Sequence, residues 1–342
     1  MNWKKWKWIP IALLVVGAKV GMSWYTHYRH DEILAQCNNQ DAETIITGCT
    51  ALINYVGEPV SNVAIAYSNR SFAYLKTKQF DNAIADAQQA IQISPNLAKP
   101  YLNRANAYHF KKDDDKALAD YNEAIRLDPN LDGAYLGRCL VYYDKKQYDN
   151  IISDMDKIIS LKPDFALAYF MRAAIYDEQK HAPDKAIADY DTAIRLTPNF
   201  ALAYAGRSTA YLRKKDYEKA MTDANEAVRL EPNSSDAHNI RGVVYYKKKQ
   251  YDLSLAEYNE ALRLRPDSAD AYDNRGETYG AMGQDDKAIE DTTTAIHLKP
   301  DLADAYQNRG HAKLHKGDKT GGNADLARAK ELGWDEYDSA NL

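Results

Sequence analysis

Prolines recur along most of this chain at an almost constant interval, and the pattern of apolar and polar positions repeats with them. The interval is 34 residues, apart from one of 35. Each proline follows a helical pattern such as AIRLDPN and precedes Asn or Asp. Because proline cannot continue a helix and an Asx side chain can cap the next one, each period predicts a pair of helices. The prolines are Pro95, Pro129, Pro163, Pro198, Pro232, Pro266 and Pro300.

Small and aromatic residues keep fixed places within each period. Counted from residues 64, 98, 132, 166, 201, 235, 269 and 303, position 8 is small or cysteine, and position 27 is alanine in every unit but one. Tyrosine occupies position 4 in seven units and position 11 in seven. Small columns let two antiparallel helices approach closely, and aromatic columns fill the space between units. The surplus of tyrosine, 26 against six phenylalanines, is mostly a product of this repetition.

The register resembles that of the tetratricopeptide repeat (TPR) family, which has these small and aromatic columns and proline at position 32. The resemblance implies an all-α fold, a right-handed superhelical solenoid of antiparallel helix pairs, with eight units over residues 64–334. Residues 31–63 are interpreted as a degenerate leading repeat with a cysteine pair, and residues 335–342 as a C-terminal tail. Unit 3 has Cys139, Ile151, Met155 and Ile158 in its packing columns, so we expect local irregularity near the middle.

Two polar columns are unbroken: position 7 is arginine and position 23 is acidic in all eight units. One interpretation is a ladder of guanidinium groups for an acidic ligand. The favoured one is an ion pair between the two helices of each unit, contributing about 0–1 kcal/mol if exposed.

The resemblance also implies a binding surface, the concave face lined by the first helix of each unit. At the corresponding positions the centre of the array is apolar and both ends are polar. An exposed apolar patch is typical of a binding site, and asparagine can hydrogen-bond the backbone of an extended peptide. The predicted partner is therefore a protein or peptide; the alternatives are that the N-terminal segment, dimerisation or a tighter superhelix covers the apolar residues. The predicted groove residues are Asn103, Asn106, Leu136, Leu140, Tyr143, Leu167, Phe170, Met171, Leu202, Leu212, Ile240, Val243, Tyr246, Asn274 and Asn308.

Co-chaperone members of the family bind C-terminal carboxylates through a Lys/Asn/Asn/Lys/Arg clamp. Here only Lys99, Asn103 and Asn106 match it, and Gly133 and Gly137 stand where cations are needed. We therefore predict that this clamp is absent.

The N-terminus predicts export. Residues 1–30 contain five basic residues and no acidic one, and an apolar run of about 10 residues follows Trp8, as in a signal peptide. If Lys19 is tolerated, residues 8–25 instead form an anchor near the lower length limit of a transmembrane helix. Either alternative places residues 31–342 across a membrane. Cys37 and Cys49 fit an oxidising compartment, and we predict a disulfide between them, with two buried thiols as the alternative.

Charge and motifs exclude several function classes. Without residues 1–30, the chain has 39 basic and 49 acidic residues, which argues against a nucleic-acid partner. No phosphate-binding glycine loop, zinc-protease motif or nucleophile elbow occurs, so neither a catalytic site nor a cofactor is predicted. His311 and His315 lack a third ligand, and no metal site is predicted. The lysine clusters at residues 145–146, 214–215 and 247–249 are interpreted as solvated turns rather than a basic ridge.

Together these observations favour a non-enzymatic scaffold that binds a partner polypeptide outside the cytoplasmic membrane of a bacterium. Two alternatives remain open: a substrate-recruiting subunit of an enzyme complex encoded elsewhere, and a membrane-anchored organelle receptor that faces the cytosol.

Overall fold

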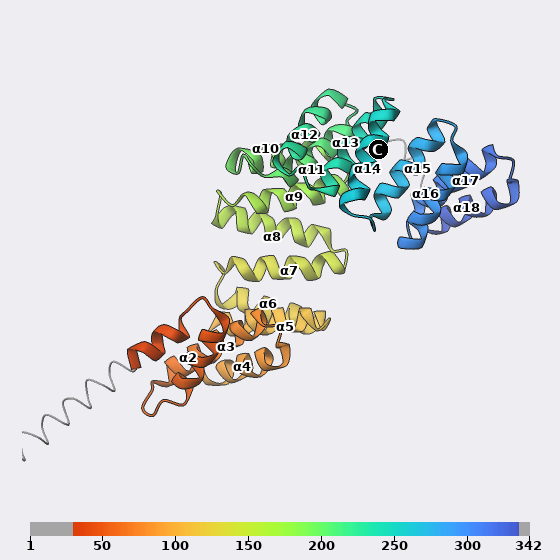
Figure 1. Ribbon diagram of the computed structural model, residues 1–342. Helices are drawn as coiled ribbons and strands as arrows, with labels where there is room; N and C mark the ends of the chain where they lie inside the picture. The colour runs from red at the N-terminus through yellow and green to blue at the C-terminus, as the bar shows by residue number, and fades with distance from the viewer. Residues whose placement is uncertain (1–29, 335–342) are drawn as a thin grey trace, which may run out of the picture. The chain divides into compact units, whose positions relative to one another are not determined.

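The computed structural model describes residues 30–334, which are helical throughout and contain no strand. Residues 30–37 form a short helical stretch, and the helices that follow pack in pairs (Figure 1). Their bounds are α2 Ala42–Ile53, α3 Val60–Lys76, α4 Phe80–Ile93, α5 Ala98–Phe110, α6 Asp114–Leu127, α7 Asp132–Asp144, α8 Tyr148–Leu161, α9 Ala166–Glu178, α10 Pro183–Leu196, α11 Ala201–Arg213, α12 Tyr217–Leu230, α13 Ser235–Lys247, α14 Tyr251–Leu264, α15 Ala269–Ala281, α16 Asp285–Leu298, α17 Ala303–His315 and α18 Lys319–Glu331.

The predicted repeat starts coincide with helix starts in seven of the eight units. The exception is the first unit, where α3 begins at Val60, directly after Pro59 and four residues before Ala64. Pro59 has no backbone N–H to leave unpaired, so it suits the start of a helix. The predicted all-α array of TPR type is confirmed.

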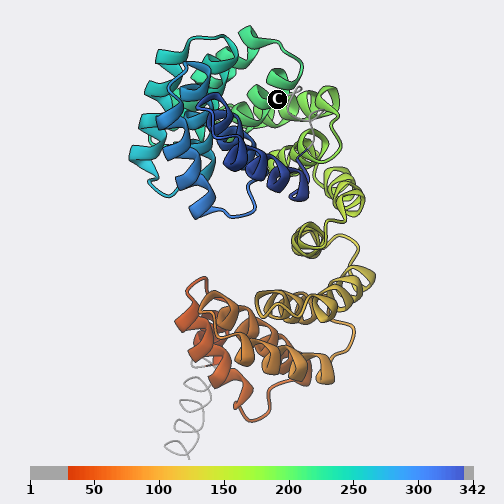
Figure 2. The same cartoon turned by 90° about the vertical axis from the view of Figure 1, so that its right-hand side faces the viewer.

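The chain divides into two compact units, with the boundary between Asp154 and Met155 inside α8. In each unit successive helices are stacked in chain order (Figure 2). The boundary falls in the third repeat, where the sequence predicts irregularity. Cys139, Ile151, Met155 and Ile158 are all buried there, in columns that hold mostly small or aromatic residues in the other repeats.

Close helix packing depends on small residues facing large rings. The ring of Tyr121, from the second repeat, is fully buried against Gly137 on the first helix of the third repeat. A Cβ atom at Gly137 would lie 2.5 Å from the Tyr121 ring, closer than any real Cβ contact. Gly137, which looks like a missing clamp residue in the sequence, is therefore required by packing.

The turn between the two helices of a repeat places one residue in the left-handed backbone region. In five repeats this residue is a lysine, with φ between 56° and 62°. Gly283 and Gly317 occupy the same place in the last two repeats, at φ 71° and 89°. The lysines with positive φ are Lys78, Lys112, Lys146, Lys215 and Lys249.

Other turn lysines pair with acidic residues 30 positions earlier. Lys145 Nζ lies 2.9 Å from Asp115, Lys248 Nζ lies 2.6 Å from Glu218, and Lys214 pairs with Asp184. The lysine clusters therefore alternate with carboxylates and do not form a uniform basic ridge, in agreement with their interpretation as solvated turns.

An ion pair joins the two helices of every repeat. The shortest nitrogen to oxygen distances are 2.5–2.8 Å, and the side chains are only 15–20 % exposed for arginine and 5–15 % for the acid. The predicted pairing is confirmed, and it is more buried than a surface ion pair. The pairs are Arg70–Asp86, Arg104–Asp120, Arg138–Asp154, Arg172–Asp189, Arg207–Asp223, Arg241–Glu257, Arg275–Asp291 and Arg309–Asp325.

Seven of these arginines also donate a hydrogen bond to the helix pair before them. Arg207 Nη1 donates to Asp191 at 2.5 Å, and Arg275 Nη1 donates to Asn259 at 2.7 Å. Both acceptors lie on the second helix of the preceding repeat. The arginine column therefore holds each helix pair together and links it to its neighbour, which leaves no free guanidinium ladder for a ligand.

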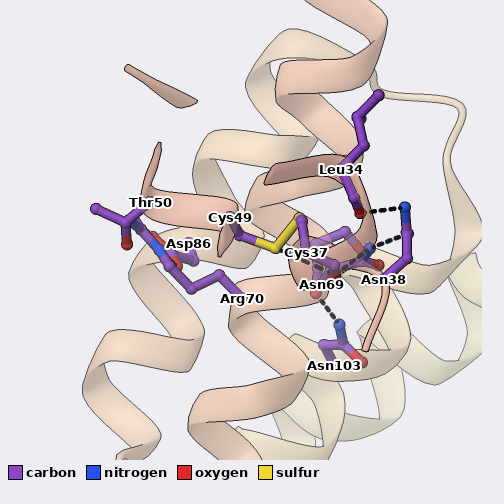
Figure 3. The surroundings of a disulfide bond; sticks show 10 residues. Leu34, Cys37, Asn38, Cys49, Thr50, Asn69, Arg70, Asp86 and Asn103 are labelled. Atoms are coloured by element: carbon purple, nitrogen blue, oxygen red, sulfur yellow. Dashed lines mark hydrogen bonds and ion pairs between the residues drawn. A yellow bond between two sulfur atoms is a disulfide. The ribbon is translucent and has the colours of Figure 1, made fainter. Parts of the chain in front are cut away.

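A disulfide between Cys37 and Cys49 closes the leading segment (Figure 3). It joins the stretch at residues 30–37 to α2, and both cysteines are buried. The two segments touch at Gly48, where a Cβ atom would lie 2.5 Å from Cys37 N. Asn69 on α3 donates to Cys37 O at 3.3 Å and Asn38 Oδ1 at 3.1 Å, which attaches this leading pair to the first repeat.

None of the helices within residues 30–334 combines the length and apolarity needed to span a membrane. The predicted signal peptide or anchor falls almost entirely in residues 1–29, and the predicted tail in residues 335–342. Both lie outside the described residues.

Candidate functional site

A pocket of about 220 Å³ opens in the second unit, on the face made by the first helices of repeats 5 to 8. These helices are α11, α13, α15 and α17, and each contacts the next across this face. The pocket is lined by Thr209, Leu212, Ile240, Val243, Lys247, Asp273, Asn274, Glu277, Asp304, Gln307 and Asn308.

One side of the pocket is aliphatic. Leu212 of α11 is 4 % exposed and packs against Val244, while Ile240 and Val243 of α13 are half-buried beside it. All three were predicted as groove residues. The structure brings them together because residues 240 and 243 are one helical turn apart and α11 packs directly on α13.

The other side of the pocket is acidic. Asp273 and Glu277 are four residues apart on α15, so both point to one face of the helix. Burial raises the pKa of Asp273 to about 8, despite a hydrogen bond from Asn308 that favours the charged form. Burial also raises the pKa of Glu277, partly offset by Lys247 and by a hydrogen bond with Tyr246. Asp304 lies on α17 at the exposed edge.

Asparagines at position 6 join each repeat to the one before it. Asn308 Nδ2 donates to Asp273 Oδ1 at 2.9 Å, Asn274 Nδ2 to Asn239 Oδ1 at 3.1 Å, and Asn103 Nδ2 to Ser68 O at 2.9 Å. Asn103 is also only 6 % exposed, so its amide stabilises the contact between repeats and is not presented to a partner. Asn274 and Asn308 line the pocket and keep capacity for a partner, since one amide has two donors and two acceptor lone pairs.

Family models match most of the repeats. Four of them, described as tetratricopeptide repeat, match residues 64–97, 98–131, 170–235 and 269–302, and a fifth, described as TPR repeat, matches residues 244–283. The chain belongs to the tetratricopeptide repeat family. TPR proteins bind proteins or peptides, and the repeats make this chain a protein–protein interaction scaffold of that type. No curated protein matches the sequence.

Two solved structures share the fold. A tetratricopeptide repeat protein from Parabacteroides merdae has a TM-score of 0.61 and 19 % identity, over 72 % of this chain and 97 % of the other. A chain of the APC/C hetero-tetramer Cut9–Hcn1 has a TM-score of 0.59 and 17 % identity, over 87 % of this chain. The match spans 58 % of that larger chain's length.

The other predicted groove residues of the second unit do not line the pocket. Leu167 and Leu202 are 40 % and 49 % exposed, whereas Phe170 packs on Phe200 with ring centroids 5.0 Å apart. Met171 is half-buried. The ring of Tyr246 is tilted against that of Tyr251, with centroids 5.7 Å apart, and burial raises the pKa of Tyr246.

The remaining predicted residues belong to the first unit. Leu140 and Tyr143 are 52 % and 51 % exposed, and Leu136 is half-buried. Asn106 Oδ1 accepts a hydrogen bond of 2.6 Å from the hydroxyl of Tyr121. The predicted groove is therefore divided into two sets of residues, one in each compact unit.

The expectation of a polar N-terminal end of the groove was wrong. Ile65, Phe72 and Phe110 occupy inner positions of the first two repeats and are 45 %, 46 % and 61 % exposed. They could have been read from the same repeat positions as the other groove residues.

The predicted groove residues omit six residues that line the pocket: Thr209, Lys247, Asp273, Glu277, Asp304 and Gln307. The last four lie at the end of the groove that was predicted to be polar. Thr209 and Lys247 occupy inner positions 9 and 13 of their repeats. Lys247 begins the lysine cluster at residues 247–249, which was interpreted as a solvated turn. The structure instead places its Nζ over the ring of Tyr246, 5.4 Å from the centroid.

One group of side chains has the spacing of a metal site: His109, Asp114 and Asp144 offer ligand atoms within 4.8 Å of one another. His109 already pairs with Asp114 at 3.0 Å, and Asp144 with Lys112 at 3.5 Å. We assign no metal to them.

Proposed function

We propose that this chain is a non-enzymatic scaffold that binds an extended segment of a partner polypeptide across the first helices of repeats 4 to 8. The observation that carries the proposal is the pocket between α11, α13, α15 and α17, with an aliphatic wall and the amides of Asn274 and Asn308. The exposed Leu167 and Leu202 extend the apolar surface on the same series of helices. Such a surface offers places for apolar side chains and hydrogen bonds for a peptide backbone.

The binding proposal is tested with a matched pair of substitutions. Leu202 and Leu253 are both 49 % exposed, but Leu202 is on a first helix and Leu253 on the second helix α14. Leu202→Asp places a charge on the proposed surface, and we expect it to lower affinity for a co-purified partner at least tenfold. Leu253→Asp should leave affinity unchanged. Equal affinities of both folded variants and wild type would contradict the proposal.

We also propose that residues 31–342 work on the non-cytoplasmic side of a bacterial membrane. Two observations support this: the Cys37–Cys49 disulfide, of a kind that persists in oxidising compartments, and the basic, then apolar N-terminal sequence. Protease added outside spheroplasts should digest the chain, and a non-reducing gel should show it oxidised. Protection from protease together with reduced Cys37 and Cys49 would contradict this location.

A further inference from the structure

We propose that the pocket of the second unit binds a cationic side chain of the partner, with the aliphatic stem of a lysine or arginine on Leu212, Ile240 and Val243 and its charged head among Asp273, Glu277 and Asp304. This inference rests on the proposed peptide-binding function and specifies the chemistry that the surface selects.

The charge of the pocket is the first argument. Three carboxyl groups line it, and Lys247 is its one basic residue. The ammonium of Lys247 lies over the Tyr246 ring. Asp270, at the neighbouring edge, is 3.9 Å from Lys299, so that carboxylate has its own counter-ion. The pocket is therefore complementary to a positive group and repels a carboxylate, the opposite of the clamp found in co-chaperones.

The shape of the pocket is the second argument. Lysine and arginine carry an apolar stem below a charged head, and they bury the stem along apolar surface. Here the aliphatic wall comes from α11 and α13 and the carboxyl groups from α15 and α17, so the two chemistries stand on opposite sides. The volume of about 220 Å³ is below the range of roughly 300–1,000 Å³ typical of sites for drug-sized molecules. It suits one long side chain.

The alternatives fit less well. A neutral apolar side chain would shield Asp273 and Glu277 from water without supplying a counter-charge, which is unfavourable for their charged forms. A divalent cation such as Ca²⁺ needs six to eight oxygen ligands, and an aliphatic wall supplies none. A lysine or arginine side chain instead places its apolar stem on the aliphatic wall and its charged head beside the carboxyl groups.

The protonation of the acids gives the binding a characteristic pH dependence. The groups that act on Asp273 are Asp270 and Glu277 on its own helix, Asp304 and Asn308 on α17, and Tyr258 on α14. Tyr246 and Lys247 on α13 act on Glu277, and Asp291 on α16 is paired with Arg275. Burial holds Asp273 with a pKa of about 8, so a cation that binds its charged form releases a proton. Affinity should rise as pH increases from 6 to 9.

The test uses the full chain with labelled Ile, Leu and Val methyl groups, since Ile240, Val243 and Leu212 report occupancy of the pocket by NMR. The probes are two capped pentapeptides, alanine throughout except for a central lysine or norleucine, which have similar stems and differ in charge. At pH 8.5 the lysine peptide should shift these three methyl signals and bind at least tenfold more tightly than the norleucine peptide. At pH 6 the difference should shrink.

Two variants serve as probe and control. Asp273→Asn with Glu277→Gln keeps the side-chain shapes and should abolish the preference for lysine. Asp301→Asn removes an exposed acid outside the pocket and should preserve it. A cooperative thermal transition and a far-UV circular dichroism spectrum like that of the wild type show that the variants are folded.

Equal binding of the two peptides at the pocket would overturn the cation proposal and leave peptide binding intact. Absence of shifts with both peptides would also overturn the cation proposal. The scaffold function is tested separately, by the Leu202→Asp and Leu253→Asp variants. Micromolar calcium chloride that shifts the same methyl groups and displaces the lysine peptide would assign the pocket to a metal instead.

Discussion

At the scale of single residues, the arginine at position 7 forms the ion pair that joins the two helices of each repeat. In seven repeats its Nε donates to an aspartate at 2.6–2.9 Å. The sixth repeat differs because Glu257 replaces aspartate and His238 replaces tyrosine. His238 Nδ1 lies 2.8 Å from Glu257, which accepts only from Nη2 of Arg241, and Arg241 Nε is left buried without a partner.

Arg275 tests the strength of these pairs. Arg275→Ala leaves Asp291 without its cation in a site where its side chain is 8 % exposed, so we expect a loss of about 3 kcal/mol in the free energy of unfolding. The double variant Arg275→Met with Asp291→Leu should recover most of it. Arg263→Ala, in an exposed pair with Glu260, should cost less than about 1 kcal/mol in urea denaturation. Equal losses for Arg275→Ala and Arg263→Ala would contradict the claim that the buried pair stabilises the fold more than the exposed one.

The left-handed turn makes a second residue-scale prediction. Lys215 has φ 59°, a conformation that costs most residues about 1 kcal/mol and glycine nearly nothing. Glycine also gains freedom in the unfolded chain, so we expect Lys215→Gly to stabilise the fold by only about 0.5 kcal/mol. Lys214→Gly, at φ −80°, should instead destabilise it. Thermal melts of the two variants compare them, and a lower melting temperature for Lys215→Gly would refute the argument.

Asp273 predicts how stability depends on pH. Its pKa in the folded chain is raised from 3.8 to about 8, so its contribution to stability is full below pH 4 and is lost as pH rises through 8. Asp273→Asn removes this titration. Between pH 5 and pH 9 the wild type should lose at least about 1.4 kcal/mol relative to the variant, the equivalent of one pKa unit. A difference between the two that stays constant across this range would show that Asp273 is charged throughout.

At the scale of helices, the sequence was most informative where the period was strict. The small columns and prolines predicted seven helix starts to the residue, because each proline ends a helix and the packing columns allow one register. The site was predicted less completely. Leu212, Ile240 and Val243 were found from their inner positions, but Lys247 was hidden in a lysine cluster. Hydrogen bonds between repeats, such as that from Asn103 to Ser68, depend on neighbours that one sequence position does not reveal.

The leading helix pair makes a prediction of its own. The Cys37–Cys49 disulfide closes a loop of 12 residues and should contribute about 3 kcal/mol by restricting the unfolded chain. Reduction of the wild type should therefore lower the melting temperature of the leading segment. Cys37→Ser with Cys49→Ser should melt at the lower temperature with or without reductant, and Cys139→Ala should still respond to reductant. A wild type that melts identically in both conditions would refute the contribution.

At the scale of the whole molecule, the boundary between the two compact units falls inside α8, in the repeat that has Cys139, Ile151 and Ile158 in columns that are otherwise mostly small. The sequence predicted one array of eight units with local irregularity near its middle, and not a division into two units. The division separates the predicted groove residues into two sets. Asn103, Asn106, Leu136, Leu140 and Tyr143 belong to the first unit, and the remaining ones, including those that line the pocket, belong to the second. The second unit therefore carries the central claim, that a partner polypeptide lies along the first helices of its repeats.

Site-specific photo-crosslinking tests that claim most directly. A benzophenone amino acid is introduced at Gln307, which lines the pocket, at the exposed Leu202, or at Leu253 on a second helix as the control. The account predicts that Gln307 and Leu202 capture the same partner polypeptide in the living cell and that Leu253 captures none of it. Capture of that partner from Leu253 but not from Gln307 or Leu202, with all three chains folded, would contradict it.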